Sequence, residues 1–388
     1  MLNKRLISRR NALLLGLGSL SSVGVIATAK TKYQSDQIKL LDNPKRTFKV
    51  FGGITLRKHA SARGILYGAA AREDLLVSNP ELATSYAQQC GILVPEWELK
   101  WNILRPAPDK FDFTKADWLA KFAHTHGMLF RGHTLVWHEA LPPWFNSTVN
   151  QQNAQKFLVE HITTVTKHYA GHMHSWDVVN EAIEPNDNRA DGLKNTPWLQ
   201  FLGPDYIDLA FRVAAQADPK ALLVYNDYGL EYDNPKDEAK RTAVLKLLER
   251  LKSKGTPIHG LGIQSHLTGY ETHFNPKKLR RFLADVASLG LKILITELDV
   301  VDQKLPAAFT VRDRIVAATY EDYLSVVLAE PAVIAVLTWG LSDRYTWHST
   351  YAPRSDKAAV RPLPLDSQLK PKLAWNAMAR AFDKAPRR

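Results

Sequence analysis

Residues 176–181 read Trp-Asp-Val-Val-Asn-Glu, a short apolar run that ends in two polar side chains. Residues 293–297 read Ile-Leu-Ile-Thr-Glu and repeat this arrangement further along the chain. Short apolar runs are typical of strands that are buried on both faces of a parallel sheet. In a closed barrel of such strands, the polar residues that carry out chemistry lie at the carboxyl ends of the strands. The two runs therefore favour a barrel with Glu181 and Glu297 at its mouth.

Six further segments show the same strand pattern, which brings the candidate strands to eight. The eight are Leu66–Ala70, Gly91–Val94, Leu129–His133, Trp176–Asn180, Leu222–Asn226, Gly260–Gln264, Ile293–Thr296 and Ala335–Trp339. Between them, apolar residues recur with a helical period, as at Val244, Leu247, Leu248 and Leu251. Eight strand–helix units in about 320 residues fit a barrel that needs roughly 250 residues plus loops. The sequence predicts an α/β protein, a (β/α)8 TIM barrel in a single catalytic domain.

An open doubly wound sheet is the alternative fold. When such a sheet binds a nucleotide, it usually has a glycine-rich turn after its first strand. Here Gly68 is followed by Ala-Ala-Ala-Arg, so nucleotide binding is disfavoured. Polar or aromatic residues end most of the strands, as a barrel mouth requires. They are Arg131-Gly132-His133, Asn180-Glu181, Asn226-Asp227-Tyr228, Gln264-Ser265-His266, Glu297 and Trp339.

Composition excludes several classes of protein. The 388 residues are 45% apolar and 23% charged, which supports a large folded core. Cys90 is the one cysteine, so a disulfide framework or a multi-cysteine metal centre is excluded. The histidine pairs 133/138 and 172/174 have no third ligand at a suitable spacing, and we expect no metal and no cofactor. The net charge is +12, but the basic residues are scattered, so we expect no nucleic-acid partner.

Residues 1–29 have the pattern of a bacterial export signal. Arg9 and Arg10 precede an uncharged stretch that ends in Ala-Thr-Ala at 27–29, as in twin-arginine signals. An uncleaved membrane anchor is the alternative, which the glycines and serines of the stretch disfavour. We expect a periplasmic or extracellular protein with no stable membrane association after cleavage. The expected boundaries are 1–29 for the signal, 30–60 for a lead-in and 61–388 for the barrel.

The two glutamates suggest a reaction class. Strands four and seven lie nearly opposite one another in an eight-stranded barrel, so Glu181 and Glu297 can face each other across a pocket. Glycoside hydrolysis needs such a pair of carboxyl groups, about 5–5.5 Å apart for retention and about 6.5–9.5 Å apart for inversion of configuration. Taken singly, a glutamate after a strand is more often an ion-pair partner at the barrel rim. Tryptophan and tyrosine near the mouth fit a saccharide, because sugar rings stack on aromatic faces.

Seven short motifs follow one another along the chain. They are Glu96–Trp101, Gly132–His138, Trp176–Glu181, Asn226–Tyr228, Gln264–Leu267, Ile295–Asp299 and Thr338–Gly340. In this order they resemble the motifs of glycoside hydrolase family 10, the retaining endo-β-1,4-xylanases built on (β/α)8 barrels. The resemblance runs from about residue 66 to residue 382. It implies an enzyme whose partner is a xylan-type polysaccharide, and we expect a monomer.

The resemblance also implies roles for individual residues. Glu181 corresponds to the acid/base and Glu297 to the nucleophile, with catalytic support from Asn180, His266 and Asp299. His266 is expected to donate a hydrogen bond to Glu297 while Asp299 holds its other nitrogen, and Asn180 is expected to contact the sugar 2-hydroxyl. Eight further residues are expected to bind the substrate. They are Glu96, Lys100, His133, Trp137, Tyr228, Gln264, Trp339 and Trp347.

Two positions depart from the family pattern. Trp97 stands where family members usually have Asn, and Ala140 stands where they usually have Gln; both positions touch the −2 sugar in the family. We hypothesise that discrimination against glucose-type or branched substrates is relaxed there. Two alternatives therefore stay open. One is the same mechanism on a β-1,4-glucan, a mixed-linkage glucan or an exopolysaccharide, and the other is a barrel that only binds saccharide.

Overall fold

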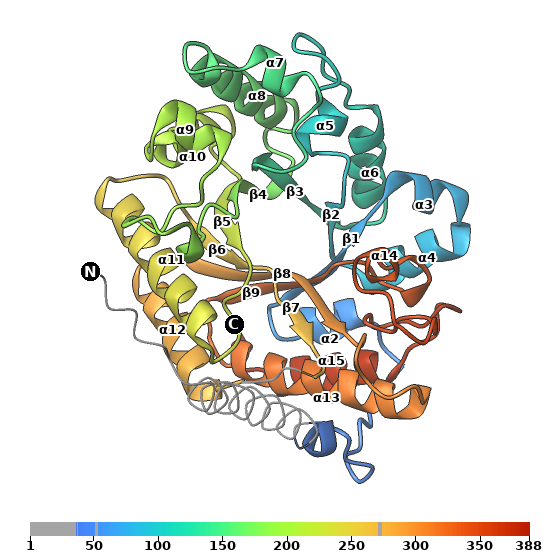
Figure 1. Ribbon diagram of the computed structural model, residues 1–388. Coiled ribbons are helices and arrows are strands. Elements are labelled where there is room, and N and C mark those ends of the chain that lie inside the picture. The colour runs from blue at the N-terminus through green and yellow to red at the C-terminus, as the bar shows by residue number, and fades with distance from the viewer. Residues whose placement is uncertain (1–35, 37, 51–52, 271–273) are drawn as a thin grey trace, which may run out of the picture.

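Eight parallel strands close into a barrel in the computed structural model, which describes residues 36, 38–50, 53–270 and 274–388 (Figure 1). The strands are β1 (Leu66–Ala71), β2 (Ile92–Pro95), β3 (Leu129–Val136), β4 (Met173–Asn180), β5 (Leu222–Asp227), β6 (Gly260–Ile263), β8 (Lys292–Val301) and β9 (Val333–Thr338). They follow the order β6-β5-β4-β3-β2-β1-β9-β8, and pairing of β6 with β8 closes the ring. The predicted (β/α)8 barrel is confirmed. The predicted export signal, residues 1–29, lies outside the described residues.

One short strand was not predicted. Strand β7 (His266–Thr268) pairs with the second half of β8, and two residues separate it from the end of β6. Between the pairs Ile263–Ile295 and His266–Asp299, β8 has one residue more than the facing chain. This register shift lets β8 continue past the predicted end at residue 296, because its later residues pair with β7.

The helices lie around the barrel (Figure 1). They are α2 (Leu56–Ser61), α3 (Glu73–Ser78), α4 (Pro80–Gln89), α5 (Trp101–Leu104), α6 (Thr114–Thr125), α7 (Phe145–Thr148), α8 (Ala154–His168), α9 (Pro197–Leu202), α10 (Tyr206–Ala217), α11 (Pro235–Ser253), α12 (Pro276–Ser288), α13 (Phe309–Val327), α14 (His348–Tyr351) and α15 (Leu373–Lys384). Helix α11 begins after Asn234, whose side chain accepts a hydrogen bond from the backbone N–H of Asp237. Its predicted apolar face is buried. Each such Val or Leu contributes about 1.5–3 kcal/mol when it is fully buried.

The interior of the barrel is packed with apolar side chains below the mouth. This inner cluster consists of Ala70, Ile92, Val94, Val224, Leu294, Ala335, Leu337 and Trp339. A larger apolar layer fills the space between strands and helices, and it includes the buried Cys90. Gly132 of β3 has a steric role there, because a Cβ at this position would lie 2.0 Å from the ring of Trp176. The glycine therefore allows the close packing of β3 on β4.

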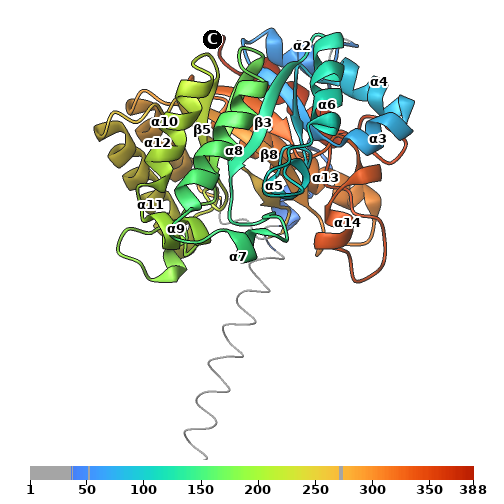
Figure 2. The ribbon, with the colours of Figure 1, turned by 90° about the horizontal axis from the view of Figure 1, so that it is seen from above.

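The two ends of the barrel differ in what they carry. At the amino-terminal end of the strands, α2 packs against α15, and the backbone N–H of Arg388 donates to the carbonyl of Arg63. Helices α7 and α14 lie at the opposite end, together with the carboxyl ends of the strands (Figure 2). None of the described helices is both long enough and apolar enough to pass through a bilayer.

Candidate active site

A cavity of about 990 Å³ lies at the carboxyl end of the barrel. Twelve of the thirteen predicted site residues line it, although they come from β7 and from seven of the eight barrel strands or the loops that follow them. They are Glu96, Lys100, His133, Trp137, Asn180, Glu181, Tyr228, Gln264, His266, Glu297, Trp339 and Trp347. The thirteenth, Asp299, is completely buried behind His266. The structure therefore brings the predicted residues together around one cavity.

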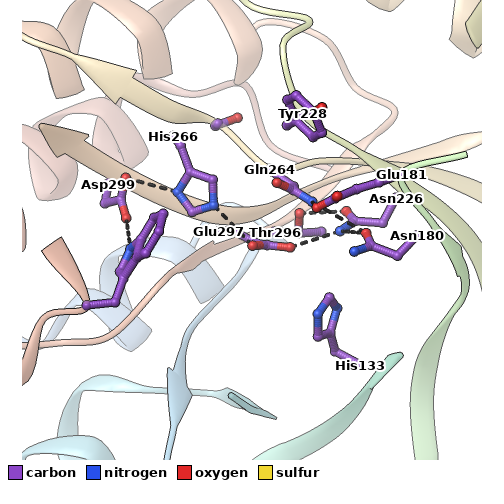
Figure 3. Close-up of polar contacts among 12 residues, drawn as sticks. His133, Asn180, Glu181, Asn226, Tyr228, Gln264, His266, Thr296, Glu297 and Asp299 are labelled. Atoms are coloured by element: carbon purple, nitrogen blue, oxygen red, sulfur yellow. Dashed lines mark hydrogen bonds and ion pairs between the residues drawn. The ribbon is translucent and has the colours of Figure 1, made fainter. Parts of the chain in front are cut away.

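Glu297 projects from β8 and is held by two hydrogen-bond donors (Figure 3). His266 Nε2 lies 3.1 Å from its Oε2, and Asn226 Nδ2 donates to its Oε1 at 2.9 Å. Burial raises the pKa of this carboxyl, but the hydrogen bond from His266, the nearby His133 and the Asn226 amide together bring the pKa below its ordinary value. Glu297 is therefore ionised at neutral pH.

His266 lies between two carboxylates. Its Nδ1 is 3.0 Å from Asp299 Oδ1, on the side away from Glu297, so both predicted contacts of the ring are present. Burial lowers the pKa of His266, but Asp299 and Glu297 outweigh burial and hold the pKa well above its ordinary value. Asp299 is fixed in turn, because Trp347 Nε1 donates to its Oδ2 at 2.9 Å and His348 Nε2 lies 2.9 Å from the same oxygen. His266 is thus an imidazolium that donates through both nitrogens.

Glu181 directly follows β4 and meets a different set of neighbours. Trp137 Nε1 donates to its Oε2 at 3.0 Å, and Gln264 Nε2 donates to its Oε1 at 2.9 Å. The ammonium of Lys194 is 3.9 Å from Oε2. The backbone of Glu181 is left-handed, with φ of 56°, which is uncommon for a residue other than glycine. The turn directs its side chain to the mouth of the cavity.

Three amides connect the two glutamates. Asn180 Oδ1 accepts from Asn226 Nδ2 at 2.9 Å and from Gln264 Nε2 at 3.4 Å. These two donors also contact Glu297 and Glu181 respectively. Because Asn180 Oδ1 is occupied and no described residue accepts from its Nδ2, that nitrogen is left to donate to a ligand in the cavity.

Asn226 was not among the predicted site residues. It lies in a polar triplet at the end of β5, which was a visible signal, but the sequence alone does not show where its amide points. The hydroxyl of Thr296 donates to Asn226 Oδ1 at 2.8 Å and so fixes the orientation of that amide. Asn226 therefore presents its nitrogen to Glu297 and Asn180.

One side of the cavity combines a lysine with tryptophan rings. The Nζ atom of Lys100 lies 4.1 Å from the ring centroid of Trp97, 5.1 Å from that of Trp137 and 5.7 Å from that of Trp339. Burial lowers the pKa of Lys100, although nearby carboxylates oppose this, and burial raises the pKa of Glu96 to about 7. Trp97 keeps 40% of its surface exposed at the cavity. This side offers both an aromatic surface and polar groups.

The other side of the cavity carries Tyr228. Its hydroxyl donates to Glu184 Oε2 at 3.4 Å, and the Nζ atom of Lys240 lies 3.3 Å from its ring centroid. Lys240 is completely buried and forms an ion pair of 2.7 Å with Asp227. A buried charge thus supports the tyrosine ring from behind.

The sequence contains two histidine pairs, 133/138 and 172/174, that were considered as metal ligands. One histidine of each pair contacts another side chain of the protein. His133 Nδ1 lies 3.0 Å from Asp177 Oδ2, and His174 Nδ1 lies 3.0 Å from the hydroxyl of Ser175. Among the described residues, the group with ligand atoms close enough for a metal is His266, Asp299 and His348. As shown above, the ring of His266 is occupied by the two carboxylates.

A closed (β/α)8 barrel with two glutamates and several aromatic rings around one cavity at its carboxyl end has the arrangement of a glycoside hydrolase. The chain belongs to glycosyl hydrolase family 10, whose model matches residues 55–381. It is therefore a glycoside hydrolase, as the motifs predicted.

Named relatives and solved structures agree with this assignment. A β-1,4-xylanase of Dictyoglomus thermophilum is 37% identical over 292 residues, which are 73% of this chain and 79% of the relative. The crystal structure of xylanase 10B from Thermotoga maritima has a TM-score of 0.78 and 33% identity, and the match covers 85% of this chain and 98% of that one. Xylanase 10B from Thermotoga petrophila, solved in complex with xylobiose, has a TM-score of 0.78 and 32% identity over 87% of this chain and 99% of that one.

Proposed function

We propose that this enzyme is an exported endo-β-1,4-xylanase that hydrolyses internal β-1,4 bonds of xylan by double displacement with retention of configuration. Family membership and the xylanase relatives support the activity, and the xylobiose complex of the Thermotoga petrophila relative supports the class of ligand. The observation that carries the mechanism is the contact of Glu297 with the His266 imidazolium. A nucleophilic carboxylate must be ionised, and this contact keeps it so.

In the first step, a Glu297 oxygen attacks the anomeric carbon while Glu181 gives its proton to the departing glycosidic oxygen. The C–O bond to the leaving chain breaks with its electron pair, and a glycosyl ester forms on Glu297. Retention needs the two carboxyl groups to be about 5–5.5 Å apart. Asn180 Nδ2 donates to the 2-hydroxyl of the same sugar, a contact that strengthens in the transition state.

In the second step, Glu181 acts as a base. It takes a proton from a water molecule, whose oxygen attacks the anomeric carbon, and the ester bond to Glu297 breaks. Glu181 is then protonated and Glu297 ionised, as at the start. Gln264 contacts Glu181 and keeps that carboxyl in place in both steps.

A β-1,4-glucan or mixed-linkage glucan is a second candidate substrate, which the exposed ring of Trp97 favours. Trp97 adds a stacking surface where the family usually has an amide, and Ala140 has too short a side chain to crowd a hydroxymethyl group. One misfitting group typically changes selectivity by about 1–3 kcal/mol, or roughly 10- to 200-fold. A barrel that only binds saccharide is less well supported, because binding alone does not require an imidazolium against Glu297.

Export and a monomeric state complete the proposal. The twin-arginine pattern of residues 1–29 supports export. The monomer is supported by the cavity, since one chain supplies all of the residues assigned to it. Fusing residues 1–29 to a reporter tests export: replacement of Arg9 and Arg10 by Lys should abolish the export of the reporter. Export that persists would contradict the assignment of a twin-arginine signal.

The activity is tested with the chain from Lys30 on glucuronoxylan and on a soluble β-glucan, by release of reducing sugars, with Glu297→Ala as the blank. We expect activity on xylan that is lost in the variant. The configuration of the first product, followed by NMR, should be β. Activity in Glu297→Ala would contradict the assigned nucleophile, and an α product would contradict retention. Release from β-glucan alone would select the second candidate.

A further inference from the structure

The turn between β6 and β7 serves both glutamates at once. Gln264 contacts Glu181 and His266 contacts Glu297, so two neighbours of one residue reach the two carboxyl groups (Figure 3). The residue between them, Ser265, has a left-handed backbone with φ of 63°. Such a conformation is unfavourable for any residue other than glycine. The surrounding structure must therefore hold this turn.

Glu231 contacts the turn directly. Its Oε1 accepts a hydrogen bond from the backbone N–H of Ser265 at 3.0 Å, and its Oε2 accepts one from the N–H of Leu230 at 2.8 Å. The side chain is almost completely buried, with 4% exposed. The hydroxyl of Ser265 is held separately by Tyr323, at 2.6 Å. Burial and the nearby Asp237 raise the pKa of Glu231 to about 7, although its hydrogen bonds from backbone N–H groups oppose this. The carboxyl group holds the turn through these accepted hydrogen bonds.

Glu231 lies on a loop that is itself fixed. Arg241 of α11 donates to the carbonyl of Leu230 at 3.0 Å and to that of Tyr232 at 2.7 Å. The hydroxyl of Tyr232 accepts from the backbone N–H of Thr268 at 2.7 Å. The loop after β5 is therefore joined to the β6–β7 segment at two points, and one of them is the turn that carries Gln264 and His266.

We propose that Glu231 is a positioning residue for catalysis, which holds the left-handed turn at Ser265 so that Gln264 meets Glu181 and His266 meets Glu297. Glu231 does not touch the reacting atoms. It acts through the two side chains that do contact the glutamates. The inference rests on the proposed function for the roles of Glu181 and Glu297.

The test compares Glu231→Ala and Glu231→Gln with the wild type. The control is Asp218→Ala, which also removes a buried carboxylate that accepts a backbone hydrogen bond, from the N–H of Lys220 at 3.0 Å. Asp218 lies before β5, at the end of the barrel away from the cavity. The substrates are xylan and 2,4-dinitrophenyl β-xylobioside, whose leaving group needs no acid. For each variant, kcat and KM are measured separately and kcat/KM is followed from pH 3 to pH 8.

For Glu231→Ala we expect kcat to fall about 10- to 100-fold on both substrates, because a displacement near 1 Å at the reacting groups has effects of this size. KM should change less than about threefold, since Lys100 and Trp339 are on other elements. The acid limb, which is the fall of kcat/KM at low pH, should move to a higher pH by about half a unit or more, because His266 no longer contacts Glu297. Glu231→Gln keeps one acceptor and should show a smaller loss, while Asp218→Ala should keep the wild-type kcat and acid limb.

Wild-type kcat and an unmoved acid limb in Glu231→Ala would overturn the proposal. Equal effects in Asp218→Ala would also overturn it, since they would show a general loss of stability. If Glu231→Ala does not fold, kcat and the acid limb of Glu231→Gln decide whether the proposal stands. Failure of the proposed function is distinguishable, because it would appear in the wild type or in Glu297→Ala. In that case, kcat and the acid limb of the Glu231 variants are compared with those of the wild type on whichever glycoside the wild type hydrolyses.

Discussion

Replacing His266 by Gln removes the positive charge next to Glu297 and leaves a neutral side chain in place of the charged hydrogen-bond donor. In the wild type, burial raises the pKa of Glu297, and the contact with His266 is the first of the effects that bring it below the ordinary value. The substitution also leaves Asp299 ionised and close by, without its imidazolium. Both changes raise the pKa of Glu297, so the nucleophile becomes protonated at a higher pH.

The size of the change follows from the contact that is lost. A hydrogen bond to a charged group contributes about 1.5–3 kcal/mol, and one pKa unit corresponds to about 1.4 kcal/mol. The expected shift is therefore about one to two pH units. The lower end of this range applies, because His133 and the amide of Asn226 still favour the ionised form. The shift in the pKa of Glu297 is upward. The variant therefore loses activity at low pH before the wild type does, and it recovers the ionised Glu297 as the pH rises.

The assay is kcat/KM on 2,4-dinitrophenyl β-xylobioside from pH 3 to pH 8, since this leaving group makes the first step independent of an acid. His174→Gln is the matched control, because His174 lies near the start of β4, on the side of the barrel away from the cavity. The control should keep the wild-type acid limb. An acid limb in His266→Gln that coincides with the wild type would refute the reasoning that His266 keeps Glu297 ionised.

Three further outcomes are expected. Asn226→Ala removes the donor to Glu297 Oε1 and should lower the steady-state kcat/KM by about 10- to 100-fold, equivalent to about 1–3 kcal/mol. The melting curve of the variant should match that of the wild type, which controls for a loss of stability. An unchanged kcat/KM would contradict the role of the amide. Trp97→Ala should reduce kcat/KM on cellooligosaccharides about tenfold more than on matched xylooligosaccharides, and an equal effect on both would contradict a glucose-tolerant −2 site. Lys240→Met leaves Asp227 as an unpaired buried carboxylate and should cost about 3–5 kcal/mol in urea unfolding, whereas adding Asp227→Asn should recover part of that loss.

The sequence was sufficient to predict the barrel because each strand is a short apolar run followed by a polar residue. That pattern follows from strands that are buried on both faces and end at an open cavity, so it is visible without knowledge of tertiary contacts. Strand β8 shows where this prediction from the sequence pattern stops. The apolar residues after Glu297 were not assigned to a strand, because they pair with β7 only after a one-residue shift in register that no local pattern reveals.

The location of the site residues was predictable, but their mutual contacts were only partly so. The contacts of His266 with Glu297 and Asp299 followed from the family resemblance. The contacts of Asn226 and Glu231 did not, because they depend on where the backbone turns. Two of those turns are left-handed non-glycine residues, at Glu181 and Ser265, and nothing in their side chains marks them for that conformation.

The meeting of α2 and α15 at the closed end of the barrel has a practical consequence. The backbone hydrogen bond from Arg388 to Arg63 brings the last residue next to the start of the barrel, behind the layer of apolar side chains that separates both from the cavity. A partner domain fused after Arg388 would therefore lie at this end of the barrel, away from the catalytic pocket.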